Sequence, residues 1–181
     1  MSAKKPTPTW SAVKTKLSSF DHAGLISLVQ HLYAASKDTR TFLHARLRLG
    51  GDPLAPYKAT IDRFLWPAVL QQEGISVAKA KNAIADYKRA SGTAAGLAEE
   101  MVFYCEQATG FVRDVSMGDE GYFEALVRMF GQALKAIDTL PQTQRPALLA
   151  RLNAVRQVSH DFGYGVGEDM DSLLEEHGGY G

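Results

Sequence analysis

Hydrophobic residues recur along this chain with a period near 3.6, which is the spacing of one face of an α-helix. The stretch after Asp21 shows one such stripe, formed by Leu25, Leu28, Val29, Leu32 and Tyr33. No segment alternates apolar and polar residues in the way that a half-buried strand does. The pattern therefore predicts an all-α fold.

Start and stop signals divide the pattern into nine predicted helices. Asp and Ser residues are placed as N-caps, and Gly and Pro follow the expected ends. Asp52 is expected to cap the fourth helix, with Pro53 at its first position. The predicted helices cover 10–18, a segment from 22 onward, 38–49, 53–67, 77–90, 94–116, 120–139, 145–160 and 168–176. Short connections favour antiparallel neighbours, which indicates an irregular α-solenoid-like stack or, alternatively, a compact bundle.

The length of 181 residues is sufficient for one domain with its own core. We expect a flexible tail over residues 1–8 and a single helical domain over 9–181. Cys105 is the only cysteine in the sequence, so no internal disulfide is possible. This usage, with no signal-peptide pattern and no apolar run long enough to span a membrane, predicts a cytoplasmic protein without membrane contact.

Charge is divided unevenly along the chain although the total is zero. Residues 1–92 carry fourteen Lys and Arg against six Asp and Glu, a net charge of +8. Residues 93–181 carry the opposite net charge, −8. Such asymmetry indicates a nucleic-acid or partner surface, or two halves that neutralise each other locally. The opposite charges also suggest self-association.

Two predicted helices, 38–49 and 77–90, carry most of the candidate binding residues. If these helices lie side by side, their basic side chains form one surface suited to phosphate groups. The alternative is a solvated lysine-rich face, and no aromatic residues are interleaved for base stacking. The candidate binding residues are Arg40, His44, Arg46, Arg48, Lys81, Asp86, Lys88 and Arg89.

Arg46 is expected on the apolar face of its helix, between Phe42 and Leu49. A buried arginine needs a charged partner, because an unpaired buried charge is very costly. Asp62 and Asp86 are the candidate partners. The two interpretations are a structural ion pair within a helical hairpin and an arginine that binds an anion in a groove.

The segment HDFGYGVGED at 160–169 has three alternate glycines between two pairs of ligand-type residues. A metal site here would take nitrogen and oxygen ligands from five side chains: His160, Asp161, Glu168, Asp169 and Asp171. Their spacing matches no established metal loop. The favoured interpretation is a joint between two helices, with the late acidic residues near the positive end of the last helix dipole.

The common sequence signatures of enzymes are missing. The sequence has no G-x-S-x-G, P-loop or H-E-x-x-H motif. Cys105 falls on the inward stripe of its helix, which predicts a packed thiol. We therefore expect no enzymatic activity, no cofactor and no bound metal, and a metal-dependent enzyme at 160–171 is a distant alternative.

Three segments resemble a known family. These are LYAASKDTRTFLHARL at 32–47, AKNAIADYK at 80–88 followed by Ser91 and Gly92, and the Gly163-Tyr164-Gly165 joint. Together they resemble a group of small bacterial helical proteins that is known as a domain of unknown function, over most of residues 20–175. The resemblance implies a bacterial cytoplasmic protein and implies no activity, cofactor or site residue.

The sequence as a whole favours a non-enzymatic helical module that binds a protein partner or a second copy of itself. Nucleic-acid binding through the basic N-terminal half is the alternative hypothesis.

Overall fold

The computed structural model of the protein describes residues 7–67, 74–115 and 118–177. Within these ranges the regular structure is entirely helical, which confirms the all-α prediction. A single 3₁₀ turn, Gln142–Gln144, precedes α8. The α-helices are α1 (Trp10–Leu17), α2 (His22–Ala35), α3 (Lys37–Leu47), α4 (Ala55–Leu65), α5 (Val77–Ala90), α6 (Ala94–Val115), α7 (Glu120–Asp138), α8 (Arg145–Ser159) and α9 (Val166–Glu176).

Side-chain caps fix the beginning of several helices. The carboxylate of Asp21 accepts a hydrogen bond from the Gly24 amide at 2.7 Å, and Asp119 accepts one from the Tyr122 amide at 2.7 Å. Ser76 caps α5, which covers the predicted range 77–90. These caps satisfy amides that have no partner inside the helix.

The predicted start of the fourth helix and the predicted end of the third helix are each wrong by two residues, and local backbone geometry explains both. Asp52 accepts a hydrogen bond from the Leu54 amide at 2.9 Å, so a turn precedes α4, which begins at Ala55 and not at Pro53. The helix α3 ends at Leu47 because Arg48 adopts a positive φ of 54°. A left-handed residue cannot continue an α-helix.

The contacts divide the chain into two compact units, residues 1–43 and residues 44–181. The predicted tail over residues 1–8 lies mostly outside the described residues, since the description begins at residue 7. A single domain over 9–181 stays a prediction.

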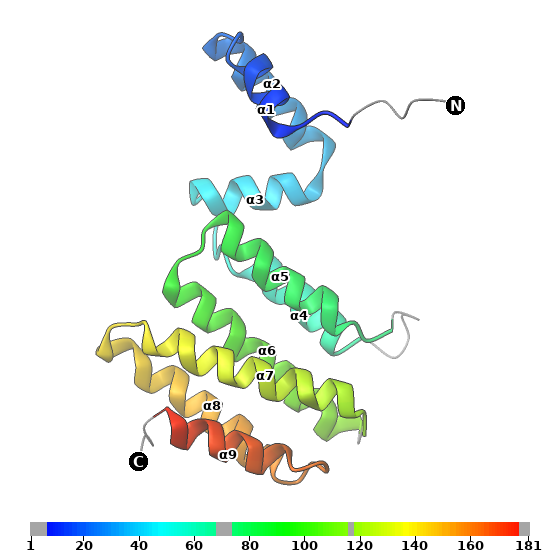
Figure 1. Ribbon diagram of the computed structural model, residues 1–181, viewed down its shortest axis with the longest axis vertical. Coiled ribbons are helices and arrows are strands. Elements are labelled where there is room, and N and C mark those ends of the chain that lie inside the picture. Colours follow the sequence, from blue (N-terminus) through cyan, green and yellow to red (C-terminus); the bar gives the residue numbers. More distant parts are fainter. Residues whose placement is uncertain (1–6, 68–73, 116–117, 178–181) are drawn as a thin grey trace. The chain divides into compact units, whose positions relative to one another are not determined.

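Residues 44–181 form layers of paired helices. Figure 1 shows α4 beside α5, then α6 beside α7, then α8 beside α9. The long helix α6 is central, because it contacts α4, α5, α7 and α8. This arrangement matches the predicted stack of antiparallel helical pairs.

The main core lies between these layers and is built largely from α6 and α7. Burial of such apolar side chains supplies most of the stability of a helical protein. Phe111 and Tyr87 are both buried. The largest fully buried apolar side chains of this core are Ile61, Leu65, Val102, Tyr104, Leu126, Phe130, Leu134, Ile137, Leu152 and Met170.

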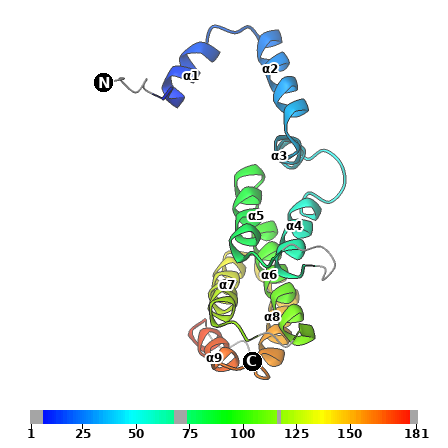
Figure 2. The ribbon, with the colours of Figure 1, turned by 90° about the vertical axis from the view of Figure 1, so that its right-hand side faces the viewer.

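Residues 1–43 contain α1, α2 and most of α3, and their described part, residues 7–43, has no comparable core. Figure 2 shows α1 and α2 as two separate helices that are joined by a short connection. None of the described residues of this unit is buried. The prediction that Phe42 packs inward is wrong, since 40% of its side chain is exposed.

Candidate functional site

The structure divides the candidate binding residues between the two units. Arg40 belongs to residues 1–43, where it is half-buried, and the other seven belong to residues 44–181. Of those seven, Lys81 is half-buried and the rest are exposed: His44, Arg46, Arg48, Asp86, Lys88 and Arg89.

The predicted inward position of Arg46 is wrong. Arg46 is exposed, and its neighbour Ala45 is the buried residue of the turn. Ala45 packs with Tyr57, Tyr87 and Ala90 in a small second core. The buried face of α3 is therefore rotated by one residue from the predicted face. Because Arg46 is exposed, its charge does not require a buried partner.

This small core brings some of the basic candidates together. Because Ala45 packs against Tyr87 and Ala90, the last turn of α3 lies near the C-terminal end of α5. Lys88 and Arg89 belong to that end. The side chain of Arg89 pairs with Asp86, so one of the positive charges there is already neutralised.

An ion-pair network that the sequence analysis missed joins α4, α6 and α8. Glu99 accepts hydrogen bonds from Lys58 at 2.6 Å and from Arg151 at 2.6 Å. Arg151 also binds both carboxylate oxygens of Glu106, at 2.7 Å each. Partial burial alone would raise the pKa of Glu99, but the bonds from Arg151 and Lys58 outweigh it and lower this pKa.

Glu100, the next residue, lies in a very different environment. Its side chain is fully buried, and neither carboxylate oxygen has a hydrogen-bond partner among the described residues. Desolvation raises the pKa of Glu100 to about 8, although the charge of Lys58 opposes this shift. Glu100 is three residues after Leu97 and four residues before Tyr104. This spacing places it beside the apolar stripe of α6, so the sequence alone gave a sign that its carboxylate is buried.

Cys105 lies in the same helix and is fully buried, which confirms the predicted packed thiol. Burial raises its pKa, and the charge of Glu106 raises it further. Both effects favour the protonated form of this thiol, and burial separates it from solvent.

Residues 160–165 form the connection between α8 and α9, as the favoured interpretation predicts, and residues 166–169 begin α9. Asp171 pairs with Arg156 and lies 3.2 Å from Nε2 of His160. The hydrogen bond from Arg156 lowers the pKa of Asp171. Glu168 and Asp169 lie in the first turn of α9, where they complement the helix dipole. Among the described residues, no group of His, Cys, Asp and Glu is arranged to hold a metal ion.

The glycines of this joint have specific roles. Gly165 has a φ of +70° and precedes α9 as its N-cap. A side chain at Gly167 would place its Cβ only 2.6 Å from the ring of His160. The close approach of α9 to the end of α8 therefore requires glycine at this position.

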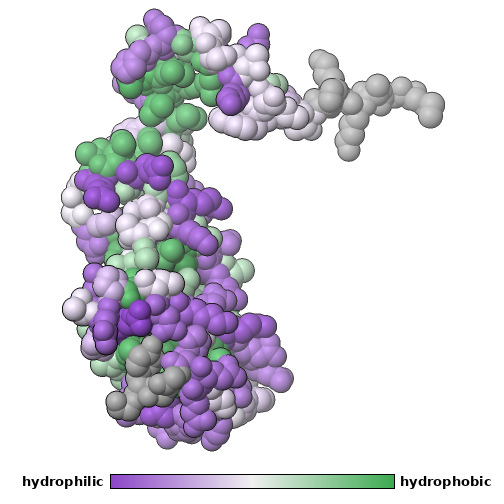
Figure 3. Space-filling view, turned by 60° about the vertical axis from the view of Figure 1, so that its left-hand side comes forward, coloured by the Kyte–Doolittle hydropathy of each residue, from purple (hydrophilic) through white to green (hydrophobic). Residues whose placement is uncertain are grey.

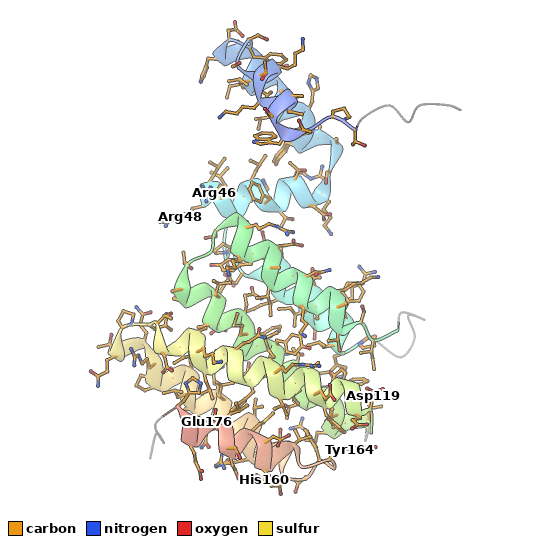
Figure 4. The ribbon with its side chains drawn as sticks, in the orientation of Figure 1. Arg46, Arg48, Asp119, His160, Tyr164 and Glu176 are labelled. Atoms are coloured by element: carbon orange, nitrogen blue, oxygen red, sulfur yellow. The ribbon has the colours of Figure 1, made fainter. Side chains whose placement is uncertain are left out.

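Tyr164 is the residue that the joint strains most. Its φ is +63°, in the left-handed region, and 64% of its side chain is exposed. A bulky residue in this region is uncommon and costs about 1–3 kcal/mol, so the surroundings must impose it. Figure 4 shows Tyr164 at the end of α9 that lies near Asp119, where α7 begins.

A cavity of about 400 Å³ opens beside this joint. Its aromatic wall consists of three rings: Phe123 is stacked on Phe162 with centroids 6.0 Å apart, and Tyr164 lies 5.6 Å from Phe123. Val112 and Val158 line the cavity, and Arg113 and Asp161 bring opposite charges to it.

The other prominent feature is an uncovered apolar surface on α2. We call Leu25, Ile26, Val29 and Leu32 the α2 apolar face; their exposed fractions range from 38% to 56%. Figure 3 shows hydrophobic residues gathered on the surface of the N-terminal helices, whereas the visible surface of the C-terminal helices is largely hydrophilic.

No family model, curated protein or solved structure matches this chain. The resemblance to a bacterial family of unknown function therefore stays a prediction. In the described part of the chain, no helix combines the length and the apolar character that crossing a membrane requires.

Proposed function

We propose that this protein is a non-enzymatic interaction module that binds a second copy of itself through the α2 apolar face. The observation that supports the proposal is the contrast within α2. The helix is 14 residues long and strongly apolar, yet it has no buried residue. An isolated helix of this length is marginal in water, so its stability must come from packing against something else.

The spacing of the leucines is suited to pairing with another helix. Leu25, Leu28, Leu32 and Ala35 are separated by three, four and three residues. This is the a/d spacing of a heptad pattern, in which two helices interlock side chains along a seam. A partner helix on this seam would cover Leu25 and Leu32, the two residues that the seam shares with the α2 apolar face.

The lack of charge on α2 favours a second copy as the partner. Residues 22–35 contain no Asp, Glu, Lys or Arg. In a two-fold interface the same surface of both copies meets itself, so a face that carries charge of one sign would repel itself. An uncharged apolar face is complementary to itself. It also offers no charge by which an acidic or basic partner would be selected.

Sedimentation velocity on the full chain tests the proposal. We expect a concentration-dependent dimer that persists at high salt, because apolar contacts are not screened. Leu32→Lys places a charge at the seam and is expected to weaken the dimer by about tenfold or more. Ser27→Lys is the matched control, because Ser27 is exposed on the opposite side of α2 and its substitution leaves the dimer intact.

A protein that stays monomeric at all accessible concentrations would contradict the proposal. So would a dimer that dissociates at high salt, because that behaviour indicates association through the oppositely charged halves of the chain.

A further inference from the structure

We propose that the cavity beside the α8–α9 joint binds an alkylated ammonium group. The inference is independent of self-association, because every residue that carries it lies within 112–164 and none lies in α2. It rests on the three rings, on the charges at the rim of the cavity and on the strained backbone of Tyr164.

The rings provide the surface that such a cation requires. Phe162 and Tyr164 present their rings to the cavity, and Phe123, which is only 3% exposed, supports them at centroid separations of 6.0 and 5.6 Å. The faces of aromatic rings carry partial negative charge and attract organic cations, and methyl groups on the nitrogen fit an apolar surface better than water does. Val112 and Val158 add apolar lining for those methyl groups.

The charges at the rim favour a cation over an anion. Within the part of the chain that the structure describes, the Asp161 carboxylate has no hydrogen bond or ion pair. Arg113 also lines the cavity, but its Nε lies 3.1 Å from the carboxylate of Asp114, which offsets its charge. The unbalanced charge at the cavity is therefore negative. The net charge of −8 over residues 93–181 acts in the same direction.

The backbone of Tyr164 indicates that its ring is held in place for a purpose other than folding. The side chain is mostly exposed, so its burial does not compensate for the positive φ of the residue. Glycine, which adopts this conformation without strain, stands on both sides of Tyr164. A tyrosine between two glycines places an aromatic ring at the mouth of the cavity where glycine alone would suit the turn.

Titration of the full chain with choline, followed by NMR, tests the inference. The neutral control is 3,3-dimethylbutan-1-ol, which has the same shape without the charge. We expect saturable binding of choline with shifts at Phe123, Phe162 and Tyr164, and binding of the neutral alcohol weaker by about tenfold. Equal binding of the two compounds, or no saturable binding of choline, would overturn the inference.

Variants separate the roles of the charge and the ring. Asp161→Asn is expected to weaken choline binding by about fivefold or more, whereas Glu175→Gln, at an exposed glutamate that does not line the cavity, does not weaken it. Tyr164→Gly is expected to lose binding while the protein melts at the same or a higher temperature, because the strain is relieved. Tyr164→Phe retains binding. Unchanged binding in Asp161→Asn or in Tyr164→Gly would overturn the assignment.

One further binding experiment identifies whether the ammonium group belongs to a protein or to a small molecule. A short peptide with a trimethyl-lysine is compared with free choline and with the same peptide carrying unmodified lysine. Tighter binding of the methylated peptide assigns the cavity to a modified protein, and tighter binding of choline assigns it to a free small molecule. Tighter binding of the unmodified peptide would overturn the preference for an alkylated cation.

Discussion

Helices α2 and α7 begin in the same way and lie in different surroundings. Each starts after an aspartate whose carboxylate accepts a hydrogen bond at 2.7 Å from the amide three residues later, from Gly24 in α2 and from Tyr122 in α7. Each also carries apolar residues at helical spacing. Both helices thus have the same kind of N-terminal cap and apolar residues at helical spacing.

The difference lies in what covers the apolar residues. In α7 ten residues are buried, among them Phe130 and Leu134, whereas α2 has none. Full burial of a large apolar side chain contributes about 1.5–3 kcal/mol. A stripe therefore predicts where a helix forms and which face is apolar, but whether the same chain covers that face depends on the tertiary neighbours.

Truncation of one large side chain in each helix measures this difference directly. Phe130→Ala is expected to lower the free energy of unfolding by about 3–5 kcal/mol, because it leaves a cavity in the core. Leu32→Ala in dilute protein is expected to change it by about 0.5 kcal/mol or less. Urea unfolding of both variants provides the measurement. A loss above about 2 kcal/mol for Leu32→Ala would show that α2 is packed in the monomer.

Glu100 tests how well residues 44–181 exclude water. Its pKa of about 8 in the folded protein lies above the ordinary value of 4.5, so the folded state holds one more proton than the unfolded state between these values. The free energy of unfolding contributed by this group therefore falls as pH rises across this window, by about 1.4 kcal/mol per pH unit at most.

Glu100→Gln removes this pH dependence. We expect the stability of the wild type relative to Glu100→Gln to fall by about 3 kcal/mol between about pH 5 and about pH 8. Urea unfolding at several pH values follows it, and Glu100→Met serves as an apolar control with the same loss of pH dependence. A stability difference that is constant with pH would indicate that Glu100 titrates as it does in water.

Removal of the two aspartate caps is expected to change the free energy of unfolding least. It compares α2 and α7 most closely, because the two caps have the same geometry. Asp119→Ala is expected to lower the stability of residues 44–181 by about 1 kcal/mol, and Asp21→Ala by less than about 0.5 kcal/mol. Trp66, which packs against the main core, reports unfolding of this unit in a Trp10→Phe background. Equal losses in the two variants would show that α2 and α7 unfold as one cooperative unit.

The helices could be predicted closely because their limits depend on nearby residues. Ser76 and Ser91-Gly92 bracket α5, and its predicted range is correct. The prediction for Arg46 failed because a difference of one residue in helix rotation exchanges a buried position for an exposed one. The prediction used the apolar neighbours of Arg46 in its own helix, whereas the structure buries Ala45 through contacts with residues of α4 and α5.

The candidate sites were harder to predict for the same reason. The partners in the ion-pair network are far apart in sequence: Glu99 meets Lys58 from 41 residues before it and Arg151 from 52 residues after it. Phe123 joins the rings of the joint from another helix, so the segment 160–169 alone gave no indication of an aromatic wall. Glu100 is different, because its spacing from Leu97 and Tyr104 gave a signal in the sequence, which the sequence analysis did not use.

Amide hydrogen exchange at low and high protein concentration tests the central claim most directly. If a second copy covers α2, its amides exchange rapidly in dilute protein and slowly in concentrated protein, while the amides of α7 are protected equally in both. Strong protection of α2 at the lowest concentration would contradict the account, because it would show that the monomer itself covers the α2 apolar face.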